Sequence, residues 1–179
     1  LRAPKTMRWD GTGVRFARPI RWLLAVYGTT PLKVSFGRLS SRPGTRVGGP
    51  LRPRAMAVRS VEAYLVGLAK TGVHLDQQER RAWIGRAVAQ TAKRAGGVAA
   101  AEMVSHGLLD EVTQLVERPF PLEGAFDAKY LALPREVLLA SMAKYQRVFA
   151  IEARGKLLPR FVAILEGTPR KPAQVRRII

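Results

Sequence analysis

The sequence has no cysteine and only two histidines, His74 and His106. The missing cysteines exclude disulfides, thiolate metal sites and cysteine nucleophiles, and they fit a reducing compartment. No carboxylates cluster near either histidine in the sequence, so we expect no metal site. No apolar run is long enough to span a membrane.

Acidic residues are also scarce. The chain has 13 Asp and Glu against 31 Lys and Arg, which gives a net charge of +18. This balance favours a polyanionic partner, with RNA, DNA or an acidic membrane as candidates, and a genomic bias toward arginine is the alternative explanation. Residues 1–59 carry 13 basic residues and one acid, Asp10, a net charge of +12. We therefore expect the polyanion surface in this first third.

Motifs for catalysis are missing as well. No Gly-rich phosphate loop precedes a Lys-Ser or Lys-Thr pair, and there is no Gly-x-Ser-x-Gly elbow. The stretch Gly11-Thr12-Gly13 lacks the third glycine of a dinucleotide site. Asp110 and Glu111 are neighbours on a predicted helix and therefore diverge toward solvent. We expect no catalytic residue and no cofactor in this chain, and structural or exposed positions for both histidines.

The first third predicts strands and turns. A hydrophobic content of 47% over 179 residues supports one large or two small folded domains. Two apolar runs, 22–27 and 32–36, predict antiparallel strands joined by a turn at 28–31, and a helix over 19–27 is the competing interpretation. Residues 37–59, rich in Arg, Gly and Pro, predict a long loop that short strands could cross.

The remainder predicts helices followed by a hairpin. Residues 60–117 form a helical segment, with helices predicted at about 61–71, 77–95 and 101–117. Ser60 is the predicted N-cap of the first helix, and Asp76 with Glu79 forms a capping-box pattern before the second. Residues 118–179 form the last segment. Its predicted elements are, in order, a short strand or extended entry at 120–122, a helix at 135–146, and a hairpin of 148–151 with 161–165 around Arg154-Gly155-Lys156. The predicted fold class is α+β: a basic β-rich N-terminal part (1–59), a helical middle, and a C-terminal helix plus β-hairpin, in one or two compact domains.

Arginines alternate with aromatic residues near the N-terminus. Arg15, Arg18 and Arg21 recur every three residues, with Phe16 and Trp22 between and beside them. Exposed aromatics beside arginines can stack on unpaired bases, whereas in the alternative reading they are core anchors and the arginine stems lie along apolar surface. Arginine also pairs with phosphate bidentately. The predicted RNA-binding residues are Arg8, Arg15, Arg18, Arg21, Arg38, Arg42, Arg46, Arg52, Arg54 and Lys144.

Four stretches share an order and spacing with one known family. They are KTMRW at 5–9 with RFARPIRW at 15–22, LLDEVTQLVE at 108–117 with Pro119, the stretch 126–138 with its YLALPREVL run, and MAKYQRVF at 142–149 with GKLLPRF at 155–161. Over nearly the whole chain this pattern resembles the β subunit of bacterial-type glycyl-tRNA synthetase. One motif departs: where the family shows Arg-Gly-His-Arg-Phe, residues 45–50 here read Thr-Arg-Val-Gly-Gly-Pro. A role of that histidine therefore does not carry over.

The resemblance implies a piece of a longer protein, and the initial Leu1 in place of Met fits that expectation. This N-terminal region is similar to the B3/B4-type modules of phenylalanyl-tRNA synthetase. In the family, the α subunit activates glycine with ATP and Mg²⁺, and the β subunit contacts tRNA. The implied function is a cytoplasmic, non-catalytic, tRNA-contacting module that supports aminoacylation, with tRNA, the α subunit and the remaining β-subunit domains as partners. A structural scaffold for α–β assembly without RNA contact is one alternative, and a hydrolytic editing site is another.

Overall fold

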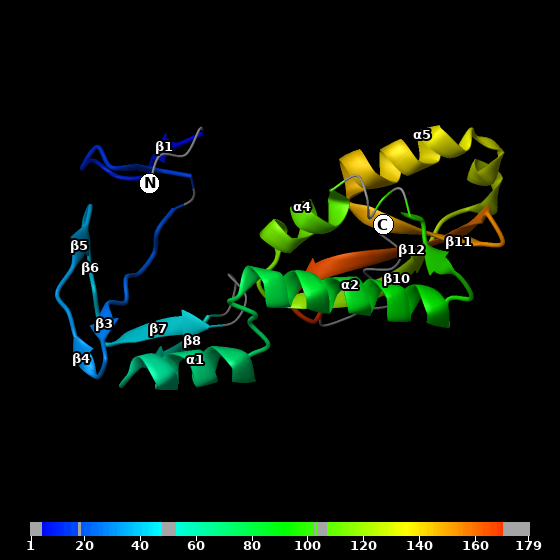
Figure 1. The fold of residues 1–179 in the computed structure, drawn as a ribbon. Coiled ribbons are helices and arrows are strands. Elements are labelled where there is room, and N and C mark those ends of the chain that lie inside the picture. Colours follow the sequence, from blue (N-terminus) through cyan, green and yellow to red (C-terminus); the bar gives the residue numbers. More distant parts are fainter. Residues whose placement is uncertain (1–4, 18, 48–52, 102, 104–106, 170–179) are drawn as a thin grey trace. The chain divides into compact units, whose positions relative to one another are not determined.

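The computed structural model describes residues 5–17, 19–47, 53–101, 103 and 107–169. Contacts between residues divide the chain into two compact units, residues 1–71 and 72–179. Antiparallel strand pairs and α-helices occur together in each unit (Figure 1). This confirms the predicted α+β class. The finer segment boundaries at 59 and 117 stay a prediction.

Short antiparallel hairpins build the first unit. In the described residues the strand pairs are β1 (Met7–Arg8) with β2 (Arg15–Phe16), β3 (Val26–Tyr27) with β4 (Thr30–Pro31), β5 (Ser35–Phe36) with β6 (Leu39–Ser40), and β7 (Gly44–Val47) with β8 (Arg54–Ala57). Two of these hairpins turn in two residues, at Gly28-Thr29 and Gly37-Arg38. Both glycines have a φ of 58°, which matches a two-residue turn to the twist of its strands.

The predicted strand at 32–36 is wrong. Leu32 and Val34 are 46% and 47% exposed, and the run divides between the hairpins that turn at Gly28 and Gly37. The run at 22–27 contributes only β3 as a strand, and the competing helix over 19–27 is wrong too. Strands β6, β7 and β8 do cross the predicted long loop of 37–59, as the sequence allowed.

Helix α1 (Val61–Lys70) ends the first unit. It begins at the predicted N-cap, where the Ser60 side chain accepts a hydrogen bond from the Ala63 N–H at 3.1 Å. Gly67 lets the helix lie against β8, because a Cβ at Gly67 would be only 2.5 Å from the Met56 sulfur. Val58 and Leu68 are the fully buried apolar residues in the described part of this unit, so its core is small.

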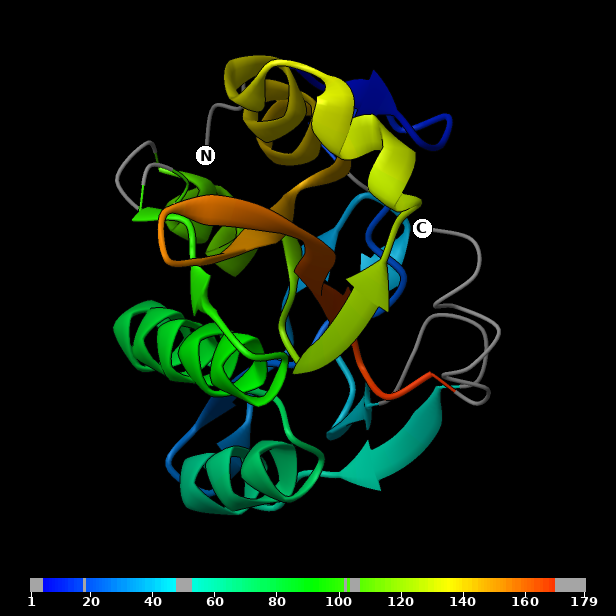
Figure 2. The ribbon, with the colours of Figure 1, turned by 90° about the vertical axis from the view of Figure 1, so that its right-hand side faces the viewer.

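A four-stranded antiparallel sheet forms the centre of the second unit. Its strands are β9 (Val98–Ala99), β10 (Pro119–Ala125), β11 (Val148–Ala153) and β12 (Lys156–Glu166), in the order β10-β12-β11-β9 (Figure 2). The predicted hairpin is confirmed: β11 pairs with β12, and positive φ values at Arg154 and Gly155 make a tight two-residue turn. The sequence did not predict β9, since two residues are too few to show an alternating pattern.

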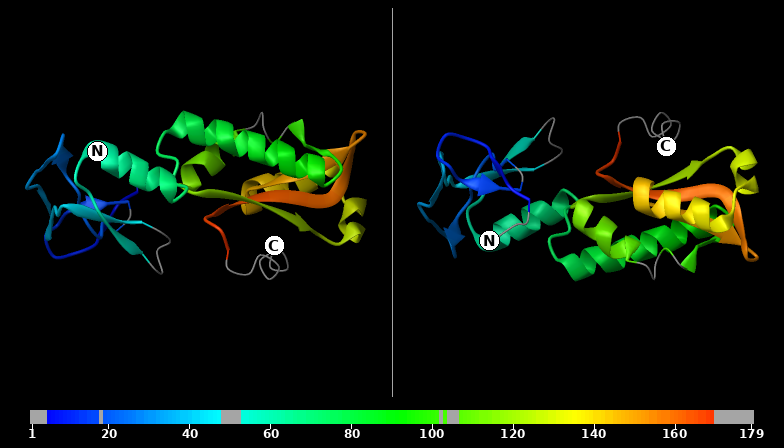
Figure 3. Two further views of the ribbon diagram at one scale, coloured as in Figure 1. Left: turned by 90° about the horizontal axis from the view of Figure 1, so that it is seen from below. Right: turned by 90° about the horizontal axis from the view of Figure 1, so that it is seen from above.

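Helices cover both faces of this sheet. They are α2 (Gln77–Arg94), α4 (Leu108–Leu115) and α5 (Arg135–Ala140), with a 3₁₀ turn at Ala128–Ala132 and a π-helical turn at Ser141–Gln146. Figure 3 shows α2 and α5 on opposite faces of the sheet. The predicted helix at 101–117 is too long. Gly107 has a φ of 82°, outside the right-handed helical region, so α4 begins only after it.

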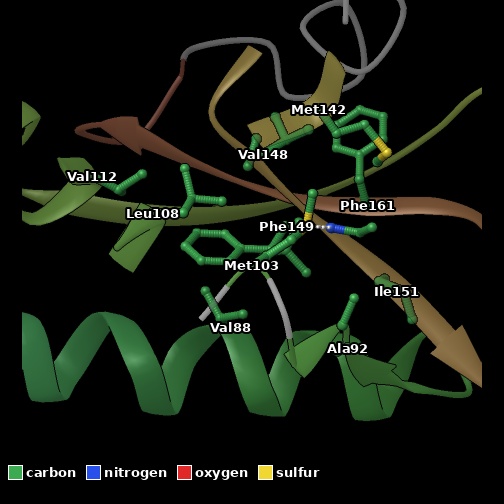
Figure 4. Packing of buried hydrophobic residues seen from close by; sticks show 14 of the residues in the cluster. Val88, Ala92, Met103, Leu108, Val112, Met142, Val148, Phe149, Ile151 and Phe161 are labelled. Carbon is green, nitrogen blue, oxygen red and sulfur yellow. Dashed lines mark hydrogen bonds between the residues drawn. The ribbon is translucent and has the colours of Figure 1, made fainter. Parts of the chain in front are cut away.

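The core of the second unit fills both faces of the central strands. Phe149 and Ile151 are fully buried on the side of α2, near Val88 and Ala92, and Phe161 lies beside Met142 (Figure 4). Burial on both faces explains why the sequence at 148–151 is continuously apolar rather than alternating. Each such side chain contributes about 1.5–3 kcal/mol to folding.

Candidate nucleic-acid interface

Most of the predicted RNA-binding residues lie in the first unit, with their side chains exposed. Arg8 is on β1 and Arg15 on β2, Arg38 forms the turn between β5 and β6, and Arg46 and Arg54 are on β7 and β8. Arg21 and Arg42 lie in exposed connections. Arg18 and Arg52 fall outside the described residues. Lys144 belongs to the second unit, where its Nζ lies 5.7 Å from the centre of the Tyr145 ring.

The structure brings four of these arginines to one groove of about 810 Å³ in the first unit. Arg21, Arg38, Arg42 and Arg46 line it, together with Trp22 and residues of β6, β7 and β8. The β7–β8 ladder supplies one wall through Thr45, which is opposite Met56 in the register. Guanidinium groups around a groove form a surface that suits phosphate oxygens.

Trp22 lies in this groove and is 36% exposed. Its indole Nε1–H donates a hydrogen bond to the Thr45 Oγ1 at 3.2 Å. The guanidinium carbons of Arg21 and Arg46 lie 5.8 Å and 5.9 Å from the ring centre, within cation–π range. Sequence reasoning missed Thr45, because no local pattern links it to a residue 23 positions earlier.

Phe16, by contrast, contacts another aromatic ring of the first unit. It is partly buried, and its ring meets Phe36 edge to face with 6.2 Å between ring centres. Arg15 also has a structural contact, since its guanidinium donates to the Thr6 hydroxyl at 3.2 Å and to the Thr6 carbonyl at 3.1 Å. Arg15 therefore ties β2 to the chain ahead of β1.

The single acid of residues 1–59, Asp10, is held within its own turn. Hydrogen bonds from the Thr12 hydroxyl and backbone N–H, with a smaller effect of Arg38, lower the pKa of this carboxyl below its usual value. Asp10 is thus ionised near Arg38 and offsets part of its charge. Arg21, Arg42 and Arg46 then contribute most of the positive charge of the groove.

Several cations of the second unit are paired with carboxylates. Among its described residues, ion pairs join Arg118 to Glu166, Arg135 to Glu152, Arg147 to Glu111, Arg160 to Glu123, Lys129 to Asp127 and Arg81 to Asp110. Arg80 donates to the Thr113 carbonyl at 2.9 Å and to the His74 carbonyl at 2.5 Å. These cations serve the fold, and neighbouring carboxylates reduce the local positive potential.

The side chains weighed for catalysis lie apart from one another. Asp110 and Glu111 diverge, because each pairs with a different arginine from a different element. The His74 ring contacts Trp83 in a tilted arrangement, with 5.4 Å between ring centres, and His106 falls outside the described residues. Within the described part of the chain, no three of the residue types that usually hold a metal gather together. Nor does any helix there have the length and apolar character of a bilayer-spanning segment.

Comparisons with known proteins point to one family. The model for the glycyl-tRNA synthetase beta subunit matches residues 1–177. The glycine–tRNA ligase beta subunit of Moorella thermoacetica is 40% identical over 169 residues, which are 94% of this chain and 24% of that protein. That of Myxococcus xanthus is 38% identical over 172 residues, 96% of this chain and 24% of its own length.

These matches confirm the resemblance seen in the four sequence stretches. The chain spans about a quarter of the length of the curated relatives it matches. Because the family model covers nearly every residue, the chain belongs to the glycyl-tRNA synthetase beta subunit family.

Proposed function

We propose that this chain is a tRNA-contacting, non-catalytic part of the beta subunit of a glycine–tRNA ligase. The observation that carries the proposal is the groove lined by Arg21, Arg38, Arg42 and Arg46, within a segment of net charge +12. Its relatives are named as subunits of a glycine–tRNA ligase, and tRNA is a polyanion that a groove of this charge can bind. The guanidinium groups bind backbone phosphates and so position the RNA.

Under this proposal the chemistry of aminoacylation belongs elsewhere in the enzyme. The described residues that line the groove include no carboxylate and no histidine, so nothing there supports acid–base catalysis or an editing hydrolysis. Glycine activation with ATP and Mg²⁺ is assigned to the α subunit. The α subunit and the remaining domains of the beta subunit are the protein partners, and the cytoplasm is the location.

The alternative, a scaffold for α–β assembly, has its own supporting observation. Several large apolar side chains of the first unit are exposed, including Met7 at 60%, Tyr27 at 79% and Val66 at 54%. Exposed apolar groups can mark protein contacts. The two functions differ in their response to salt, because phosphate contacts release counterions and apolar contacts do not.

The deciding experiment is a titration of the 179-residue chain with tRNA at about 50 mM and 200 mM salt. We expect affinity to fall steeply as salt rises. Changing Arg42 or Arg46 to Ala should weaken binding and reduce the magnitude of the salt slope by about one for each lost phosphate contact. The loss should be similar for tRNA(Gly) and other tRNAs, because phosphates carry no base identity.

A matched control comes from helix α2. Arg86 and Lys93 are exposed there, so an Arg86→Ala, Lys93→Ala pair removes two positive charges outside the groove. Arg80 and Arg81 are unsuitable controls because both hold the fold of the second unit. If the α2 pair weakens binding more than the groove variants, the interface has been placed wrongly. If tRNA binding is undetectable even at low salt, the scaffold function is the correct one.

A further inference from the structure

Trp22 gives the groove a feature that phosphate binding does not require. The hydrogen bond from its Nε1–H to Thr45 occupies the only polar group of the indole. The exposed part of the ring can therefore contact a ligand through its π surface. Every base has a π-face, so a fixed indole in a cationic groove is a stacking platform for nucleobases.

Two guanidinium groups lie over the same ring. Those of Arg21 and Arg46 are 5.8 Å and 5.9 Å from the ring centre, and both residues also line the groove. A base that stacks on the indole therefore takes the position of one of them. A base that stacks on the indole is flanked by its own phosphates, which then meet cations already held next to the ring. Proteins that bind single-stranded nucleic acid combine aromatic side chains, on which bases stack, with cationic groups that contact the phosphates.

Trp9 is a second tryptophan of the first unit that can be compared with Trp22. It is 43% exposed in the same unit, and its indole Nε1–H also donates a hydrogen bond, to the Phe16 carbonyl at 2.9 Å. It does not line the groove of Arg21, Arg38, Arg42 and Arg46. Trp9 is therefore a matched indole outside the proposed site.

We propose that the groove binds unpaired, single-stranded RNA, with a base stacked on Trp22 and the flanking phosphates on Arg21, Arg42 and Arg46. In an A-form duplex the bases are stacked within the helix, and side chains reach mainly its backbone and 2′-hydroxyls. A surface that contacts only phosphates cannot prefer an unpaired strand to a duplex. Stacking on Trp22 would create that preference, because only an unpaired base can stack on the indole. This inference rests on the proposed function, that RNA binds in this groove.

The test compares two RNAs with the 179-residue chain at low salt. One is a single-stranded oligouridylate of about 12 nucleotides, within the range of sites on stacking proteins, and the other is a blunt-ended RNA duplex without a loop and of similar phosphate number. We expect the single strand to bind more tightly. Trp22→Leu should lower that affinity about tenfold or more, which is the scale of base–aromatic stacking, and leave the affinity for the duplex nearly unchanged.

Fluorescence gives a second readout that does not depend on affinity. Binding of the oligouridylate should quench tryptophan emission in the native chain and in Trp9→Phe. In Trp22→Phe, which keeps a ring for stacking, binding should persist while most of the quench is lost. The Trp9→Leu variant should bind both RNAs as the native chain does.

The outcomes separate this inference from the proposed function. If Arg42→Ala and Arg46→Ala weaken binding but Trp22→Leu changes nothing and both RNAs bind equally, the groove reads phosphates alone and the stacking inference is overturned. If neither RNA binds at low salt, the proposed function fails, and the inference fails with it. Far-ultraviolet circular dichroism shows whether Trp22→Leu is folded. If that variant is unfolded, Trp22→Ser is tested in its place, and if Trp22→Ser is unfolded too, the fluorescence comparison with Trp22→Phe decides.

Discussion

At the scale of single residues, the same side chain has different tasks in different places. Arg80 donates to backbone carbonyls of Thr113 and His74, and Arg15 donates to Thr6, so both act within the fold. Arg46 lies beside the Trp22 ring in an open groove. An arginine count from the sequence therefore overstates the RNA-binding surface, because the fold itself uses part of the positive charge.

Glu166 provides a pH-dependent test at this scale. Desolvation raises the pKa of its carboxyl, but hydrogen bonds from the backbone N–H groups of Glu117 and Arg118 and from the Arg118 guanidinium outweigh it, so the pKa lies below its usual value. A carboxyl with a lowered pKa in the folded state stabilises the protein above its unfolded-state pKa. That contribution is lost as pH falls through the folded-state pKa.

We therefore expect Glu166→Gln to lower the free energy of unfolding by about 1 kcal/mol at pH 7, a modest value because the carboxylate is partly exposed. The difference from the native chain should shrink as the pH falls through the lowered pKa of the folded-state carboxyl, because the native carboxyl is then protonated as well. Urea denaturation at pH 7 and at a series of lower pH values measures the difference. A stability deficit that does not change with pH would show that packing, not charge, holds this contact.

At the scale of elements, strand pairing places particular residues against each other. Gly124 on β10 is directly opposite Phe161 on β12. A Cβ at Gly124 would lie 2.2 Å from the Phe161 Cζ, and Phe161 is only 2% exposed. The ring packs against Gly124 within the core, with Met142 beside it (Figure 4), so it has little room to turn away.

Gly124→Ala should accordingly destabilise the chain by about 1–3 kcal/mol, although alanine is usually better than glycine in a strand. Phe161→Leu removes the far edge of the ring, so the double variant should lose less stability than the two single changes added together. Thermal or urea denaturation of the four chains measures this coupling. Strictly additive losses would contradict the predicted clash.

At the scale of the whole molecule, charge and buried apolar surface are distributed in opposite ways. The segment 1–59 has most of the net charge, yet Val58 and Leu68 are the fully buried apolar residues in the described part of the first unit. The second unit holds a continuous core around Phe149, Ile151 and Val162. Local stability follows buried apolar contact and well-shielded hydrogen bonds.

We thus expect amide hydrogen exchange to differ sharply along the chain. Amides of the central strands β11 and β12 should exchange roughly 100-fold or more slowly than those of the short hairpins β3–β4 and β5–β6. Exchange followed by mass spectrometry of peptides measures this. Equal protection in the two regions would mean that the first unit has stabilising contacts beyond those described.

The sequence alone determined the elements whose signals are local. Capping residues Ser60 and Asp76 marked the starts of α1 and α2, and a continuous apolar run with a turn at Arg154 and Gly155 marked the hairpin of β11 and β12. The spacing of the four motif stretches indicated the family, which the comparisons confirmed. These features succeed because each depends on residues that are close together along the chain.

Only the tertiary structure decided which candidate arginines share a site. The alternation of Leu32, Val34 and Phe36 predicted a half-buried strand, but tight turns at Gly28 and Gly37 left these residues on exposed hairpins. Long-range contacts bring together the residues that line the groove. One of them, the hydrogen bond from Trp22 to Thr45, fixes the position of the indole. Periodicity reports which residues could face a core, but whether a core lies there depends on segments far away in the sequence, which is why the groove could not be read from the sequence.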